Sequence, residues 1–242
     1  GADAVKVQIH LADYESSQDD EFRVGTWFPQ DARREDYWRR MSFSPNQWDK
    51  YFQTMASHGI PVGVSCFSVE AVDLVLDSPG APAFFKIASG EVDNDELVEA
   101  MFAEHRPVII STGMSTWDEI RSGIVPRLRD LGYILNVDYA MLQCTSEYPA
   151  QPENLDLNAI GTINDEACLT GYSDHTGSPY AGIYARSKGA RIIEAHICWD
   201  KAQYGPDTPA SLTVDEFETM VDGVRWVARA ESSTRTKDEI SL

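Results

Sequence analysis

Two histidines follow apolar runs at positions where they could share a metal ion. His175 closes the sixth such run of the chain and His196 closes the seventh. Because the ends of consecutive parallel strands are neighbours, the two imidazoles are expected to lie side by side. Two imidazole ligands leave positions for water and substrate oxygen, as in a catalytic ion site. Asp174 and Glu194 are placed to orient them or to transfer protons.

Two lysines interrupt apolar strands and point to an anionic ligand. Lys6 and Lys86 each stand within a run that is otherwise apolar. A buried ammonium group without an anion is costly, so either a ligand or a carboxylate of the protein must balance each charge. Hydroxyl groups at neighbouring strand ends could donate to a phosphate or carboxylate. They belong to Ser65, Ser89, Ser111, Thr112 and Ser173.

Taken singly, each of these residues also has a structural interpretation. A lone histidine is more often a hydrogen-bonded core residue than a ligand, and a lysine can pair with a carboxylate or extend to the surface. A binding site is favoured because the two histidines, the two lysines and the hydroxyls occur together at strand ends.

Seven short apolar runs alternate with helical patterns, which predicts a parallel sheet with both faces covered. No glycine-rich phosphate turn follows any run, so a (β/α)8 barrel that lacks its first βα unit fits better than a doubly wound sheet. We expect one barrel domain over residues 1–230 and a polar tail over 231–242. The predicted strands are Ala4–His10, Pro61–Phe67, Ala83–Gly90, Pro107–Thr112, Tyr139–Thr145, Ala167–Tyr172 and Arg191–Cys198.

The helices between these strands have recognisable first residues. Ser44, Asn94 and either Ser115 or Thr116 are suited to cap helices that follow them, and a last amphipathic helix is expected from about Leu212. The segment from Leu11 to Ser42 is expected to be a long irregular loop over the site.

Composition limits the partners of the protein. The formal net charge of -19 argues against a nucleic-acid or anionic membrane surface, and no apolar stretch is long enough to span a bilayer. Four widely spaced cysteines, Cys66, Cys144, Cys168 and Cys198, suggest neither a zinc ribbon nor a disulfide framework. We therefore expect a cytoplasmic protein with reduced thiols.

Seven motifs in one order carry a resemblance to a known family. The collinear set, from Gly1 to about Ala230, resembles the N-acetylneuraminate (sialic acid) synthase family, which includes legionaminate, pseudaminate and spore-coat polysaccharide synthases. The motifs are Lys6-x-Gln8, Lys86-Ile-Ala-Ser-Gly-Glu91, Ser111-Thr-Gly-Met114, Cys144-Thr-Ser-x-Tyr-Pro149, Tyr172-Ser-Asp-His175, Glu194-x-His196 and Gly205-Pro-Asp207.

The resemblance implies a condensation of phosphoenolpyruvate with an N-acylated aldose of the N-acetylmannosamine type. A Mn²⁺ or Mg²⁺ ion would be bound by His175 and His196, and the family pattern allows a homodimer. Phosphoenolpyruvate would be held by Lys6, Lys86, Ser89, Ser111, Ser146 and Ser173, and the sugar by Gln8, Glu91, Tyr148 and Asp207.

Departures from the family pattern leave the sugar undetermined. Gln143, Ala195 and Cys66 replace residues that are usual in the family, and the chain is expected to lack the family's first strand and its C-terminal antifreeze-like domain. Two alternatives stay open: a barrel that binds a sugar or a metal without catalysis, and a Schiff-base aldolase that uses Lys86.

Overall fold

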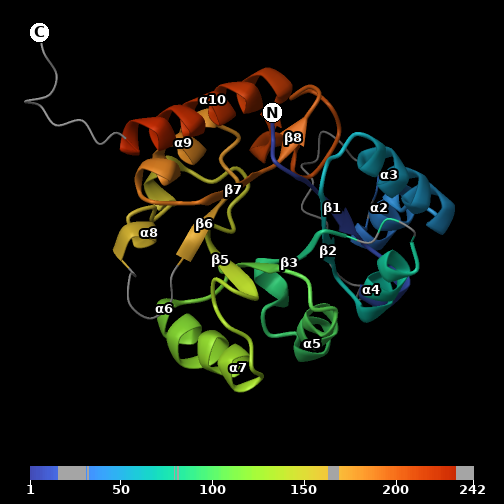
Figure 1. Ribbon diagram of the computed structural model, residues 1–242. Helices are drawn as coiled ribbons and strands as arrows, with labels where there is room; N and C mark the ends of the chain where they lie inside the picture. Colours follow the sequence, from blue (N-terminus) through green and yellow to red (C-terminus); the bar gives the residue numbers. More distant parts are fainter. Residues whose placement is uncertain (16–30, 32, 79, 81, 163–168, 233–242) are drawn as a thin grey trace, which may run out of the picture.

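Seven parallel strands form one curled sheet, and their order in space is their order along the chain (Figure 1). The computed structural model describes residues 1–15, 31, 33–78, 80, 82–162 and 169–232. The strands are β1 (Val5–Ile9), β2 (Val62–Cys66), β3 (Phe84–Ile87), β4 (Val108–Ser111), β5 (Tyr139–Cys144), β6 (Leu169–Asp174) and β7 (Ile192–Ala195). All seven predicted strands are confirmed, with shifts at their ends.

Helices lie outside the curl of the sheet, as parallel crossover connections require (Figure 1). A second sheet pairs the short strands β8 (Ile197–Cys198) and β9 (Leu212–Thr213) in parallel. The helices are α1 (Ala12–Glu15), α2 (Arg34–Met41), α3 (Pro45–Ser57), α4 (Val69–Leu76), α5 (Asp95–Ala103), α6 (Trp117–Glu119), α7 (Val125–Asp130), α8 (Ala159–Thr162), α9 (Pro179–Ser187) and α10 (Val214–Glu231).

The expected helix starts are confirmed by their caps. Asn94 accepts from the backbone N–H of Leu97 at the start of α5, at 3.3 Å. The hydroxyl of Thr116 does the same for Glu119 at the start of α6, also at 3.3 Å. Capping boxes begin α3 at Ser44 and α10 at Thr213. Each cap satisfies backbone donors that the helix itself leaves free.

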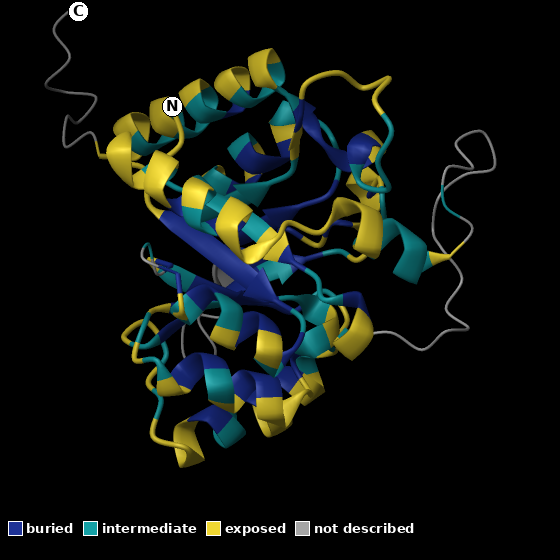
Figure 2. Ribbon diagram, turned by 90° about the vertical axis from the view of Figure 1, so that its right-hand side faces the viewer, coloured by how far each residue is buried: buried dark blue, intermediate teal, exposed yellow. Residues whose placement is uncertain are grey.

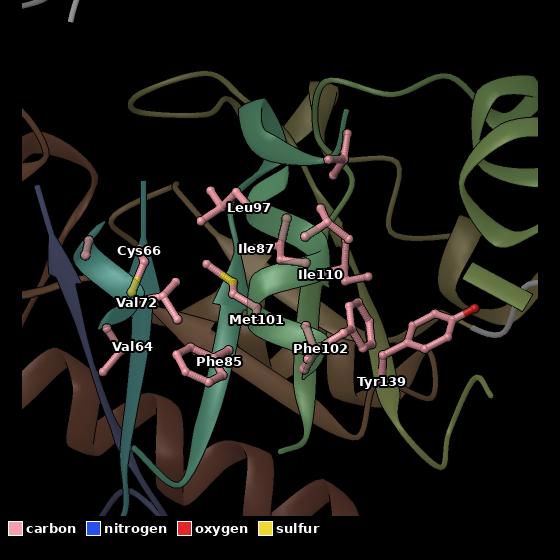
Figure 3. Close-up of a cluster of buried hydrophobic side chains, with 14 of the residues drawn as sticks. Val64, Cys66, Val72, Phe85, Ile87, Leu97, Met101, Phe102, Ile110 and Tyr139 are labelled. Carbon is pink, nitrogen blue, oxygen red and sulfur yellow. The ribbon is translucent and has the colours of Figure 1, made fainter. Parts of the chain in front are cut away.

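Alternation along the strands separates an apolar face from a polar one. Val64 and Cys66 of β2 and Phe85 and Ile87 of β3 belong to a buried cluster with side chains of α4 and α5 (Figure 3). Because successive strand residues point to opposite faces, the intervening Lys86 faces the inside of the curl. The strands run buried between helices whose outer surfaces are exposed (Figure 2).

Two details differ from the sequence interpretation. The predicted strand Arg191–Cys198 is divided, because β7 ends at Ala195 and β8 begins at Ile197, so His196 lies between two strands that belong to different sheets. The segment Leu11–Ser42 is not wholly irregular, since α1 and α2 form within it; residues 16–30 and 32 lie outside the described residues.

The structure bears on the remaining expectations only through the described residues. Cys66, Cys144 and Cys198 are free and buried, whereas Cys168 lies outside the described residues. Most of the predicted tail, residues 233–242, also lies outside them. None of the helices in the described part of the chain has the length and apolar content needed to cross a lipid bilayer.

Gly171 of β6 provides a test of the sheet. A Cβ atom at this position would lie 2.1 Å from the backbone oxygen of Ile192 in β7, so β6 and β7 would have to separate. We expect Gly171→Ala to lower the free energy of unfolding by about 3 kcal/mol, measured by urea denaturation.

Gly123→Ala is the matched control. No atom lies within 4 Å of a Cβ at Gly123, which is in the helical segment Ile120–Ile124. This variant is expected to change the stability by no more than about 1 kcal/mol. Equal stabilities of the two variants would contradict the packing of β6 against β7.

Candidate functional site

An ion cluster lies inside the curl of the sheet. The carboxylate of Glu194 in β7 is 3.0 Å from the ammonium group of Lys6 in β1 and 3.7 Å from that of Lys86 in β3. The side chain of Lys86 is 4% exposed and that of Glu194 is 19% exposed. The first and last strands of the sheet are thereby joined through charged side chains, and the structure gives both predicted lysines the same carboxylate partner.

The cluster fixes the ionisation of its carboxylate. Burial by itself raises the pKa of Glu194, but the charges of Lys86 and Lys6 outweigh that effect and lower the pKa to about 2. Burial lowers the pKa of Lys86, and the nearby carboxylate of Glu194 opposes this change. Two ammonium groups against one carboxylate leave the fully ionised cluster with a net positive charge, which favours an anion.

Two buried hydroxyls next to this cluster have no partner. The Oγ atoms of Ser65 and Ser111 are buried and make no hydrogen bond within the described part of the chain. Ser65 pairs in register with Gln8, two residues after Lys6, and Ser111 lies two residues after Ile109, the register partner of Lys86. The period of two therefore places both hydroxyls on the lysine face. Unsatisfied buried donors are uncommon and indicate a missing ligand or water.

Two of the other predicted serines lie near Cys144 at the end of β5, whereas the Thr112 hydroxyl donates to the carbonyl of Leu142 at 3.1 Å. Burial raises the pKa of the Cys144 thiol, and the nearby Ser89 and Ser173 hydroxyls oppose this change. The Ser89 hydroxyl also accepts from the backbone N–H of Gly113 at 3.0 Å. A Cβ atom at Gly113 would lie 2.7 Å from the hydroxyl of Ser146 and 3.0 Å from the thiol of Cys144, so a larger residue here would require these side chains to shift.

The two predicted metal ligands lie side by side. The ring centroids of His175 and His196 are 5.5 Å apart, and His175 is buried. Nδ1–H of His175 donates to the carbonyl of Thr145 at 2.8 Å, since a carbonyl oxygen can only accept. The lone pair is then on Nε2, which accepts from the Tyr148 hydroxyl at 3.0 Å. Burial lowers the pKa of His175 to about 4, so the imidazole is neutral near pH 7.

Tyr148 and Asp207 surround the imidazole pair. The ring of Tyr148 stacks on His175 with centroids 4.0 Å apart. The nearest carboxylate oxygen of Asp207 lies 4.0 Å from Nδ1 of His196. Two imidazoles 5.5 Å apart at their centroids suit two ligands of one divalent ion, which would take the place of the Tyr148 hydroxyl at Nε2 of His175. Among the described residues, no three histidine, cysteine, aspartate or glutamate side chains form one group that could hold a metal ion.

Asp174 has contacts of a different kind. Its carboxylate accepts from the hydroxyl of Tyr172 at 3.0 Å and from the backbone N–H of Thr176 at 2.9 Å. It is buried, and burial raises its pKa despite these hydrogen bonds. These contacts hold the turn that leads from β6 into α9, next to His175. Its predicted part in proton transfer stays a prediction.

Gln8 and Glu91 occupy different places. Gln8 is exposed and lines a pocket of about 650 Å³ together with Tyr148 and Asp207. Glu91 accepts from the side-chain amide of Asn94 at 3.0 Å, beside the start of α5, and does not line this pocket. The structure thus gathers three of the four predicted sugar-binding residues around one cavity.

The far part of this pocket is aromatic, and sequence reasoning did not predict it. Trp38 of α2 and Trp48 and Tyr51 of α3 line it, together with His10 and Phe67 at the ends of β1 and β2. The sequence does contain many aromatic residues just before and within α3, which could have indicated this lining. The same pattern is also typical of ordinary core packing.

A contact network connects α2 to the loop that carries Asp207. The guanidinium group of Arg40 lies 5.5 Å from the ring centroids of both Tyr37 and Tyr204, which pack edge-on against each other with centroids 6.2 Å apart. Arg40 and Asp31 form an ion pair at 2.6 Å, and the Tyr204 hydroxyl donates to Asp31 at 3.3 Å. This Arg40 clasp fixes the pocket wall relative to Asp207.

The fold and the site together define the class of the protein. A curled parallel sheet with a cationic cluster and an imidazole pair at its strand ends is an α/β architecture of the TIM-barrel-like kind. The structure of a sialic acid synthetase from Leptospira borgpetersenii shares this fold, with a TM-score of 0.80 and 22% identity over 98% of this chain and 76% of that one.

The chain belongs to the NeuB family, whose model matches residues 1–236. It is 32% identical to a pseudaminic acid synthase of Campylobacter jejuni over 96% of this chain and 66% of that protein. It is 31% identical to an N,N'-diacetyllegionaminic acid synthase of Legionella pneumophila over 93% of this chain and 64% of that protein. The chain spans just under two thirds of the length of these relatives, and the resemblance noted in the sequence is confirmed.

Glu194→Gln tests the ion cluster. Without the carboxylate, two partly buried ammonium groups face each other with no counter-ion, so the free energy of unfolding is expected to fall by about 3 kcal/mol. Glu231→Gln removes one partner of a more exposed pair with Arg186 and is expected to cost less than about 1 kcal/mol. Thermal unfolding of both variants measures the difference, and equal losses would contradict the clustered charges.

Proposed function

We propose that this chain is the barrel of a synthase that condenses phosphoenolpyruvate with an N-acylated aldose and water to give a 2-keto-3-deoxy nonulosonate and phosphate. The observation that carries the proposal is the positive cluster of Lys6 and Lys86, with the unpartnered hydroxyls of Ser65 and Ser111 on the same face. A doubly anionic phosphoryl carboxylate supplies the charge and the acceptors that this surface lacks.

Membership of the NeuB family supports the same reaction class. Lys6 and Lys86 would neutralise the phosphate and carboxylate of phosphoenolpyruvate, and Ser89, Ser146 and Ser173 would add hydroxyl donors. Glu194 would keep both lysines oriented toward the ligand and limit their mutual repulsion. Fixed donors of this kind lower the barrier because they need no rearrangement as charge develops.

The imidazole pair fits a divalent ion such as Mn²⁺ or Mg²⁺. His175 and His196 would hold it, and Thr145 keeps the Nδ1–H tautomer of His175 that leaves Nε2 for the metal. An ion bound here would polarise the aldehyde oxygen of the sugar. Tyr148, Gln8 and Asp207 would orient the sugar beside it, since all three line one pocket.

The chemistry balances without a redox partner. C3 of phosphoenolpyruvate forms a bond to the aldehyde carbon, and the aldehyde oxygen takes up a proton to become a hydroxyl. Water adds at C2, the bond from C2 to the phosphate oxygen breaks, and C2 becomes a ketone. The protein would accelerate the reaction mainly by holding the two substrates close together in reacting positions, and less through a covalent intermediate.

We also propose that the seven strands fill seven of the eight positions of a (β/α)8 barrel. The remaining position would lie between β1 and β7, which form the two edges of the sheet. Contact between Lys6 and Glu194 across this position supports the proposal, because side chains from both edges already meet there.

A Schiff-base aldolase is the second candidate. Burial lowers the pKa of Lys86, as an imine-forming lysine requires. Borohydride trapping of pyruvate on Lys86 would support it, whereas the synthase predicts no trapping.

Metal-dependent release of phosphate from phosphoenolpyruvate tests the synthase. We expect release only with both Mn²⁺ and an N-acylated aldose, and a loss of about a hundredfold or more in His175→Ala and in Lys86→Met. The assay is run with this chain and with the full natural protein, because the chain spans just under two thirds of its relatives.

His58→Ala is the matched control, since His58 is exposed at the end of α3 and bonds only to its own helix and neighbour. It should retain the release rate. Absence of release from folded protein that binds Mn²⁺ would instead favour a barrel that binds its ligands without turning them over.

A further inference from the structure

The loop that carries Asp207 is closed at its base by two short strands. This Asp207 loop, residues 199–211, connects β8 to β9. Ile197 of β8 pairs with Leu212 of β9, and the backbone N–H of Leu212 donates to the carbonyl of His196 at 2.8 Å. Since His196 directly precedes β8, both ends of the loop are held next to one member of the imidazole pair.

Lys201, within this loop, binds acceptors from three different segments. Its ammonium group donates to the carbonyls of Gly177, at 3.0 Å, and Ser211, and it lies 3.1 Å from a carboxylate oxygen of Glu216. Gly177 belongs to the turn that follows His175, whereas Ser211 ends the Asp207 loop. Glu216 lies in the first turn of α10. An ammonium group has three N–H donors, so these three contacts use all of them.

The Asp207 loop also packs directly against the turn after His175. A Cβ atom at Gly177 would lie 2.6 Å from the backbone oxygen of Pro209, so the two backbones approach closely there. The φ of Gly177 is 67°, which glycine adopts without strain. The hydroxyl of Ser211 donates to the carbonyl of Asp207 at 2.8 Å. The ammonium group that binds Ser211 is therefore connected, through that residue, to the backbone of Asp207.

We propose that Lys201 is a positioning residue for the reaction: its ammonium group holds the Asp207 loop and the turn after His175 at the separation that lets both act on one sugar. It acts through the two segments that it joins. The inference rests on the proposed function, because that function assigns the sugar to Asp207 and the metal to His175 and His196.

The contact with Glu216 offers a simpler interpretation, in which Lys201 only attaches the loop to α10. The two side chains of this pair are 37% and 38% exposed, and ion pairs so exposed contribute little to stability. The carboxylate of Glu216 also accepts from the backbone N–H of Thr213, in the capping box that begins α10. Glu216→Gln keeps an acceptor for this cap and removes only the charge, so it separates the two interpretations.

Steady-state kinetics of the full natural protein test the proposal. In Lys201→Met the Asp207 loop is no longer held before the sugar binds, so part of the binding energy of the sugar is used to order it. We expect the KM for the N-acylated aldose to rise about tenfold, and kcat to fall by less than about threefold because the bound sugar orders the loop again. Lys201→Arg keeps the charge and several donors, and it should restore most of the KM.

Glu216→Gln should change the KM by less than about twofold. Lys188→Met is the matched control, because the ammonium group of Lys188 lies over the ring of Tyr184 in α9, 5.0 Å from its centroid, and it should keep both kinetic constants. Lys201→Gln is the second variant, with the same expected result, in case Lys201→Met does not fold. An unchanged KM in the Lys201 variants, or an equal rise in Glu216→Gln, would overturn the inference while the synthase stands.

Amide hydrogen exchange separates this inference from the proposed function, since it requires no turnover. Within the Asp207 loop, the backbone N–H of Ser211 donates to the carbonyl of Thr208 at 3.1 Å. We expect this amide to exchange about tenfold faster in Lys201→Met than in the natural protein or in Lys188→Met. That result would support the positioning role even if no phosphate were released. Equal exchange in all three proteins would overturn it.

Discussion

The contact of Glu194 with Lys6 and Lys86 is the interaction on which the rest of the structure depends. It joins β1 and β7, the two edges of the sheet, to β3 in the middle. A flat sheet would keep these side chains apart, so the carboxylate of Glu194 can pair with both ammonium groups only because the sheet is curled. The same contact leaves an excess of positive charge inside the curl, and architecture and anion binding thus have one cause.

The strand period explains how so polar an interior coexists with a packed core. In β2 and β3, Val64 and Phe85 pack outward against helices, while Ser65 and Lys86 turn inward. Inward residues gain little from burial of apolar surface, so the outer face provides most of the hydrophobic stabilisation. The inner face can therefore contain unpartnered hydroxyls, whose cost a bound ligand would remove.

Much of this could be predicted from the sequence, because the signals were local. Apolar runs located every strand of the seven-stranded sheet, and capping residues such as Asn94 located helix starts. The pairing of both lysines with one carboxylate could not be predicted, since it depends on the curvature of the sheet. The division at His196 was missed because Arg191–Cys198 reads as one apolar run. The aromatic lining of the pocket was missed because rings that line a cavity and rings that fill a core share the same spacing.

The Arg40 clasp has a consequence for how the pocket can change. Tyr204 lies only three residues before Asp207, and Arg40 and Tyr37 belong to the helix that supplies Trp38. Because these contacts join α2 to the loop of Asp207, a displacement of α2 would be expected to move the carboxylate beside His196 as well. Under the proposed function, sugar preference should therefore be easier to change by exchanging single rings of the pocket than by moving the helix that carries them.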